Sequence, residues 1–187
     1  MGKIIYDSHF EKIDFSELKG QSFEACTFVD CQFTEADFSA YEFLACEFRS
    51  CDLSMATLHK SAWKDVRFHQ CKLLGLHFKD CNTFLLQLFF QDCILDLCSF
   101  FKLPLKKSSF LSCSIKEVDF AEADLSYGVF DDSNLHMSIF DQTNLQHADF
   151  RKAENYQIDP EMNRITKAKF SSSGLAGLLG SYDIHIS

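Results

Sequence analysis

The sequence is short of the two residues that usually make tight turns: it has 7 Gly and 2 Pro among 187 residues. Glycine reaches positive φ angles without strain, and proline presets the first turn position. If the chain turns often, ordinary residues must therefore make the turns. The chain is not a disordered acidic tail, because 47% of its residues are hydrophobic and 21 are Phe.

Long apolar runs are also missing. The first ten residues, MGKIIYDSHF, lack the apolar core of a signal peptide. The most apolar stretch, residues 84–101, holds two Gln and two Asp and is too short and too polar to span a membrane. We therefore expect a soluble cytoplasmic protein with no membrane partner, whose nine cysteines are thiols and not disulfides.

Basic residues are outnumbered, with 18 Lys and Arg against 27 Asp and Glu and a net charge of −9. This balance disfavours direct nucleic-acid binding, which needs a basic surface. It permits a basic protein partner, including a protein that itself binds DNA. The charge is uneven along the chain, since residues 61–113 carry more bases than acids and both flanking stretches are acidic.

What the sequence does have is a large apolar residue at every fifth position. These positions, the repeat centres, run unbroken from Phe23 to Phe78 and again from Phe90 to Phe150. A period of five forms no stripe on an α-helix, and on a straight strand it alternates between the two faces. The chain must therefore bend once per repeat, as in a solenoid. Between the two runs the phase slips by two residues, which predicts a bulge or small loop at 82–88.

The number of sides follows from the identity of the centres. They alternate strictly from Leu105 to Phe150, which demands an even number of sides, and every fourth centre from Phe28 to Phe150 is Phe. Four sides and about seven coils of 20 residues fit this pattern best. The position two before each centre is usually small and holds all nine cysteines, so we expect these thiols to be small buried hydrophobes.

The repeat resembles that of the pentapeptide-repeat family over about residues 10–155. The segments that carry the resemblance are ADFSA (36–40), ADLSY (123–127), SNLHM (133–137), TNLQH (143–147) and ADFRK (148–152). The resemblance implies an all-β fold, a right-handed four-sided parallel β-helix. We assign residues 1–156 to this pentapeptide-repeat solenoid and residues 157–187 to a C-terminal cap and dimerisation segment.

Two short stretches resemble particular branches of that family. CDLSMATL (51–58) is similar to the Qnr-type quinolone-resistance proteins, and IDPEMNRI (158–165) is similar to the tail of the microcin-immunity member. Both relatives act on DNA gyrase, and the Qnr type is thought to mimic duplex DNA. The resemblance therefore implies a protein-binding solenoid that binds or protects a type II topoisomerase.

Outward positions supply two candidate partner surfaces. A DNA mimic would use exposed acids, and the candidates are Glu35, Asp37 and Glu42. The alternative function is a structural scaffold that binds an unrelated partner through an exposed apolar side. The residues predicted for that apolar surface are Leu74, Phe89, Leu97 and Phe101.

The C-terminal segment begins with serines and then carries leucines at helical spacing. We expect one more extended piece around Phe170, a short α-helix with Leu175, Leu178 and Leu179, and a final strand over 183–186. A solenoid needs its open end covered. The resemblance adds that relatives dimerise through this end, so the same residues are candidates for a homodimer contact.

No motif for catalysis, metal binding or cofactor binding is present. The cysteines form no C-x-x-C pair and the histidines have no paired spacing for a metal. The sequence also lacks a nucleophile elbow, a P-loop and an H-E-x-x-H motif. We therefore expect no enzyme activity and no cofactor.

Overall fold

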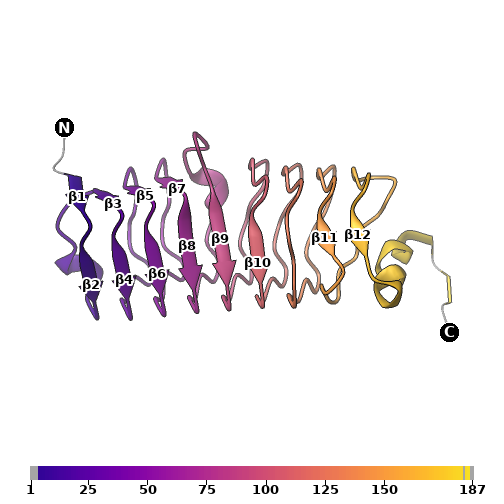
Figure 1. The fold of residues 1–187 in the computed structure, drawn as a ribbon, viewed down its shortest axis with the longest axis horizontal. Coiled ribbons are helices and arrows are strands. Elements are labelled where there is room, and N and C mark those ends of the chain that lie inside the picture. Colours follow the sequence, from indigo (N-terminus) through magenta and orange to yellow (C-terminus); the bar gives the residue numbers. More distant parts are fainter. Residues whose placement is uncertain (1–3, 183, 186–187) are drawn as a thin grey trace.

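The computed structural model describes residues 4–182 and 184–185. These residues form a rod of stacked coils, with β1 at one end and the C-terminal helices at the other (Figure 1). The strands are β1 (Ile4–Tyr6), β2 (His9–Glu11), β3 (Ser22–Glu24), β4 (Thr27–Val29), β5 (Glu42–Leu44), β6 (Glu47–Arg49), β7 (Ala62–Lys64), β8 (Val66–His69), β9 (Leu88–Gln91), β10 (Ser109–Leu111), β11 (Asp149–Phe150) and β12 (Lys169–Phe170). Four 3₁₀ helices complete the described part: η1 (Phe15–Glu17), η2 (Phe78–Asp80), η3 (Ser172–Leu178) and η4 (Gly180–Tyr182).

Four parallel ladders run along the rod, one on each side. The first side is the sheet β1-β3-β5-β7, and the second is the sheet β10-β9-β8-β6-β4-β2, continued by β11 and β12. Isolated bridges such as Gln32 to Asp52 form the third side, and bridges such as Asp37 to Thr57 form the fourth. Each of these two bridges joins residues 20 apart, which confirms the predicted coil length. The solenoid has about eight turns, one more than predicted, because Phe10 and Phe170 extend the Phe column beyond both ends of the counted repeat.

The coils bend at residues two places after each centre. Nearly every such residue has a positive φ, for example Ala25 (52°), Asp30 (52°), Glu35 (57°) and Ala40 (60°), and few are glycine. The prediction that ordinary residues make the turns is confirmed. A non-glycine residue in this left-handed region costs about 1–2 kcal/mol, so the coils carry backbone strain at their corners.

This strain predicts that glycine stabilises the corners. Replacing exposed Ala40 by Gly removes the clash of its Cβ and keeps the main-chain bond from its N–H to the His59 carbonyl (2.9 Å). We expect the free energy of unfolding to rise by about 0.5–1 kcal/mol in urea denaturation. The control is Ala121→Gly, one residue before a corner and without positive φ, where a loss of about 0.5–1 kcal/mol is expected. Equal effects at the two sites would contradict the strain argument.

Stacked aromatic columns fill the interior. On the second side, Phe28 stacks on Phe48 with ring centroids 4.6 Å apart, and the column continues in near-parallel steps to Phe150 and Phe170. The Phe columns of opposite sides meet edge to face across the interior, as Phe90 and Phe100 do at 6.0 Å and 71°. This alternation follows the ring quadrupoles. The repeat centres are therefore the core, as the period of five predicts.

The small residues two places before the centres close the inner corners. All nine cysteines are buried there as free thiols. Several donate weak hydrogen bonds to carbonyls of the previous coil, as Cys51 Sγ does to Phe28 O (3.4 Å), and Ser133 Oγ makes the same bond to Phe110 O (3.0 Å). Burial raises the pKa of the Cys46, Cys81 and Cys98 thiols to about 12, so they remain protonated and unreactive.

The phase slip is a small projecting loop. Ala62 pairs with Asn82, 20 residues on, but Val66 pairs with Leu88, 22 residues on, so two extra residues lie between Asn82 and Leu88. The loop stands out beside β9 in Figure 1. Leu86 turns inward and is buried, whereas Phe84 and Leu85 are each 66% exposed. The predicted loop is confirmed.

The predicted α-helical cap is wrong in type: η3 and η4 are 3₁₀ helices. Within η3, Gly174 and Gly177 are spaced by three, which matches the three residues per turn of a 3₁₀ helix and places them on one face. Gly174 and Gly177 lie so close to Tyr156 that a Cβ on either would collide with it. This close approach, not the leucine spacing, selects the tighter helix. Ser171 caps η3 by accepting a hydrogen bond from the Gly174 N–H, as predicted.

Two other C-terminal predictions have different outcomes. The extended piece around Phe170 is confirmed, because β12 pairs with β11. The final strand is not found at Ile184 and His185, which form no ladder with the described residues, and the rest of that prediction, residues 183 and 186, lies outside the described residues. The boundary at 156/157 stays a prediction, although the ladder itself continues to Phe170.

Candidate partner-binding surfaces

Function must be sought on the outside of the rod, because aromatic and aliphatic side chains fill its interior. Within residues 4–182 and 184–185, no three His, Cys, Asp or Glu residues are placed to share a metal ion. In the same residues, no helix has the length and apolar character needed to cross a bilayer. What remains is the pattern of charge, exposed apolar side chains and shallow grooves on the four sides.

The predicted acids lie near one another but not on a single side. Glu35 occupies the corner between the third and fourth sides, Asp37 follows on the fourth side, and Glu42 lies past the next corner, on β5. All three are exposed. Hydrogen bonds from Ser39, including its N–H at 2.9 Å, hold the pKa of Asp37 below its usual range, so Asp37 is ionised at neutral pH.

A second acidic group lies four coils further along the fourth side. It comprises Asp119, Glu122 and Asp141, which the bridges and corner positions of that side bring together. By the usual strand spacing it lies about 19 Å from Asp37. Lys79 and Lys102 lie between the two groups, and Lys102 pairs with Glu122 at 3.3 Å. The sequence indicated that this stretch is acidic, but not that these carboxylates share a side.

Acids on the second side are mostly paired. Glu47 contacts both Arg49 (2.8 Å) and His69 (3.1 Å). The Arg151 guanidinium donates to Asp149 at 2.7 Å and lowers the pKa of that carboxyl to about 2. Because matched bases cancel their charge, these acids add little to the field of this side. On the fourth side Lys102 cancels Glu122 in the same way, but within the described residues Asp37, Asp119 and Asp141 form no salt bridge, which makes this side the stronger acidic surface.

The structure separates the predicted apolar residues. Leu74 lies on the third side, and Leu97 lies on the next coil, at the corner between the third and fourth sides. Exposed Met55 and Ile94 lie next to them. Phe101 lies on the fourth side with Lys102 Nζ 4.7 Å from its ring centre. Phe89 lies on the second side, opposite the fourth, and Arg67 covers its ring at 4.4 Å. The four residues are therefore not one contact surface.

Sequence reasoning missed the largest exposed apolar side chains, Phe84 and Leu85 on the projecting loop. Leu44, on β5 of the first side, is 41% exposed and lines the same groove as Leu85. A groove of about 400 Å³ runs beneath the loop, with Leu44, Leu85 and Lys106 among its walls. The available signal was the run FLL at 84–86, which places three large apolar residues where the repeat has one core position.

The C-terminal candidates divide into core and surface. Phe170 stacks on Phe150 at 5.5 Å and, with Leu178, packs against the core, so both close the end of the solenoid. Leu175 is 49% exposed and Leu179 is 36% exposed, which leaves them free for a contact between copies. The structure therefore places Phe170 and Leu178 in the cap, whereas a dimer contact through Leu175 and Leu179 stays a prediction.

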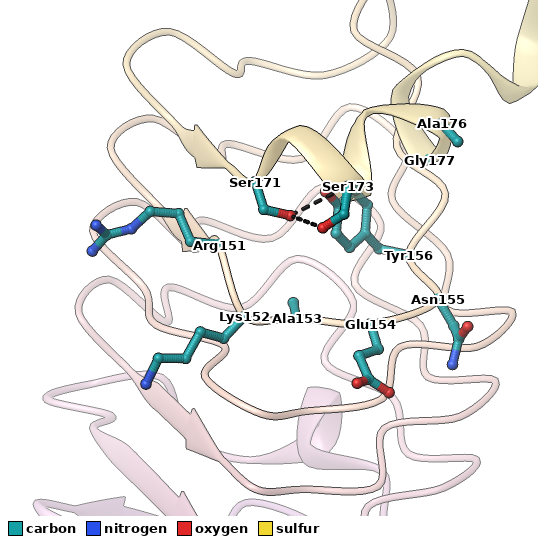
Figure 2. A pocket seen from close by; sticks show the side chains of 11 residues that line it. Arg151, Lys152, Ala153, Glu154, Asn155, Tyr156, Ser171, Ser173, Ala176 and Gly177 are labelled. Carbon is teal, nitrogen blue, oxygen red and sulfur yellow. Dashed lines mark hydrogen bonds between the residues drawn. The ribbon is translucent and has the colours of Figure 1, made fainter. Parts of the chain in front are cut away.

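A pocket of about 460 Å³ is lined by residues of η3 and of the last coil. Figure 2 shows Ser171 and Ser173 above it and Lys152 and Glu154 below, with the Arg151 and Lys152 side chains directed away from the two serines. Tyr156 lies behind the serines, and its hydroxyl is buried without a hydrogen-bond partner. The Ser171 and Ser173 hydroxyls hydrogen-bond to each other at 3.0 Å and so already have partners. We therefore interpret the pocket as a gap beside the cap and not as a binding site.

Family models identify the repeat directly. One, described as a pentapeptide repeat region, matches residues 3–78, and another, described as pentapeptide repeats (8 copies), matches residues 113–154. The chain belongs to the pentapeptide-repeat family. Among curated protein sequences, none matches the chain significantly.

Comparison with solved structures gives one match that supports the fold and a weaker one. A trypsin-treated variant of QnrB1, a plasmid-mediated fluoroquinolone resistance protein, is 18% identical with a TM-score of 0.64, and the match covers 98% of this chain and 97% of that one. HetL, involved in heterocyst differentiation regulation in the cyanobacterium Nostoc, is 14% identical with a TM-score of 0.44, covering 91% of this chain and 85% of that one. At 18% identity, the QnrB1 match shows similarity of fold only.

Proposed function

We propose that this pentapeptide-repeat protein is a non-catalytic, protein-binding rod in the cytoplasm whose partner is a type II topoisomerase, DNA gyrase. It would occupy the DNA-binding surface of the enzyme as a mimic of duplex DNA. The observation that carries the proposal is the solenoid itself, which matches a fluoroquinolone resistance protein over nearly its whole length and has a filled interior. Recognition is then left to the outer surface.

The acidic groups of the fourth side support this partner. A DNA mimic needs carboxylates where a basic partner expects phosphates. Asp37 with Glu35 at one end, and Asp119 with Glu122 and Asp141 at the other, offer two such groups on or beside one side. A homodimer joined through Leu175 and Leu179 would double the number of groups along one axis. The quinolone-resistance phenotype would follow from protection of gyrase.

Charge reversal of these acids tests the proposal in a gyrase supercoiling assay with and without a fluoroquinolone. We expect wild-type protein at micromolar concentration to inhibit supercoiling or to protect gyrase from the drug. Changing Glu35, Asp37 and Glu42 to Lys, or Glu122 and Asp141 to Lys, should weaken either effect at least about tenfold, because repulsion replaces attraction at each site. No effect of the wild-type protein, with or without drug, would remove gyrase from the proposal.

The matched control is the pair Asp30→Lys and Asp92→Lys. Both residues are exposed corner residues between the second and third sides, diagonally across the rod from Glu122. The net charge changes as much as in the Glu122 and Asp141 variant. If the control loses the gyrase effect equally, total charge and not the fourth side explains the result.

A structural scaffold is the second candidate, favoured by the exposed apolar residues of the third side. Met55 (57%) and Leu97 (54%) lie at its corner, with Ile94 (43%) beside them. An apolar contact there would be lost on changing Leu97 to Asp. If Leu97→Asp and Phe101→Asp leave partner binding intact while the acid reversals abolish it, the scaffold function is contradicted.

A further inference from the structure

The projecting loop creates a groove on the first side that the fold does not need. Only Leu86 of the loop packs into the core, while Phe84 and Leu85 remain two-thirds exposed. The groove beneath them, about 400 Å³ in volume, has Leu44, Leu85, Leu86 and Pro104 as its apolar walls. Concave apolar sites of this size bury a large side chain of a ligand. The chain therefore holds a preformed apolar slot beside its largest exposed apolar residues.

The charge around the groove is opposite to that of the whole chain. Lys64 and Lys106 line it, and Lys64 Nζ lies 5.8 Å from the centre of the Phe84 ring. The acid in its lining is Asp65, and Arg67 pairs with Asp65 at 3.2 Å. A groove rimmed by two lysines attracts a negatively charged ligand, although the net charge of the protein is −9.

The extent of this positive region limits the ligand. Along the first side, Glu24 lies one coil before the groove, Glu42 lies at its edge on the same strand as Leu44, and Asp124 follows it, with Asn82 and Pro104 between. The positive stretch covers about three coils, roughly 14 Å at the usual strand spacing. A longer polyanion would meet these carboxylates within about one Debye length and be repelled. A nucleic-acid strand does not fit this pattern, whereas a short acidic segment does.

We propose that this groove binds a short acidic peptide segment of a partner protein, with one large apolar side chain seated between Leu44 and Leu85. Carboxylates of the segment pair with Lys64 and Lys106 on the rim. The inference rests on the proposed protein-binding function and deepens it, since it gives the partner a second, oppositely charged contact with the rod. The fourth side attracts basic surface, and the groove attracts acidic segments.

Selection from a random peptide display library on the immobilised full-length protein tests the groove. We expect enriched peptides to combine two or more acids with an aromatic or leucine residue, and their binding to weaken with added salt. An enriched peptide made synthetically should lose at least about tenfold in affinity to the Lys64→Glu and Lys106→Glu variant, which replaces two favourable ion pairs by repulsion. Peptides without acids, or no enrichment, would overturn the proposal.

Matched variants separate the groove from general effects. Leu85 and Leu97 are both exposed leucines with positive φ (57° and 64°), so Asn, which tolerates that conformation, replaces either without loss of the fold. Leu85→Asn should weaken peptide binding and Leu97→Asn should not. For charge, Lys79→Glu with Lys116→Glu changes the net charge equally on other sides and should leave binding intact. Equal losses in either matched pair would contradict the groove.

The gyrase assay distinguishes this inference from the proposed function. Peptide binding that depends on Lys64 and Lys106, without any gyrase effect of the wild-type protein, would keep the groove and remove the topoisomerase. Gyrase protection by a protein that enriches no acidic peptide would do the reverse.

Discussion

Replacing Phe110 by Ala will lower the free energy of unfolding by about 3–5 kcal/mol. Phe110 is fully buried and stacks between Phe90 (5.1 Å) and Phe130 (4.9 Å). It also meets Phe100 and Phe120 edge to face. Removing one ring breaks a column in the middle of the rod, where the coils above and below cannot move together to fill the cavity. Urea denaturation monitored by circular dichroism measures the loss.

The control for this change is Phe84→Ala. Phe84 is 66% exposed on the projecting loop, and its ring contacts Lys64 rather than the core. We expect a change within about 0.5 kcal/mol, as for most surface substitutions. Similar losses at the two positions would mean that the loop packs onto the core more tightly than its exposure implies.

Replacing Gly177 by Ala will detach the cap from the end of the solenoid. A Cβ at this position would collide with the Tyr156 carbonyl oxygen and lie 2.8 Å from its ring carbon Cδ2. The main chain cannot yield there, because the Ile158 N–H donates to the Gly177 carbonyl at 2.9 Å. We expect a loss of about 2–3 kcal/mol, typical of overpacking, and faster proteolysis within residues 171–182.

Two neighbouring glycines make this prediction specific. Gly180→Ala should change nothing, since a Cβ there meets no atom within 4 Å. Gly174→Ala should destabilise the cap because its Cβ meets the Tyr156 hydroxyl, and Tyr156→Phe should restore stability by removing that oxygen. Tyr156→Phe alone should be neutral or stabilising, because the buried hydroxyl has no hydrogen-bond partner. If Gly177→Ala and Gly180→Ala unfold alike, close packing on Tyr156 does not hold the cap.

These variants also bear on the proposed dimer. Leu175 lies on η3, which Gly177 positions, and Leu179 is the residue that ends it, so a detached cap should lose any contact between copies that uses these leucines. A Leu175→Ser and Leu179→Ser variant removes the same contact without disturbing Tyr156. The molecular mass in solution, measured by light scattering, then separates loss of the cap from loss of the contact.

Predictions about the candidate surfaces depended on information that the repeat only partly contains. The repeat states which residues face outward, and Glu35, Asp37, Leu97 and the other candidates do so at least in part. The side that each outward residue occupies depends on the number of residues in every preceding coil, including the two extra residues of the phase slip. Phe89 and Phe101 are both next to a core Phe in sequence, yet they lie on opposite sides of the rod.

The sequence by itself determined the solenoid, because a period of five leaves an extended chain no way to bury its bulky residues except by bending after each quintet. It also determined the four sides, the filled interior and the inert thiols, all of which follow from which positions face inward. The tertiary structure alone decided the type of the cap helix, the separation of the apolar residues and the groove beside Phe84 and Leu85. These features arise from the way segments far apart in the chain come together, such as Gly177 against Tyr156 and Leu44 and Leu85 around one groove. A local periodicity records how each residue faces, but not which residues of other coils it will meet.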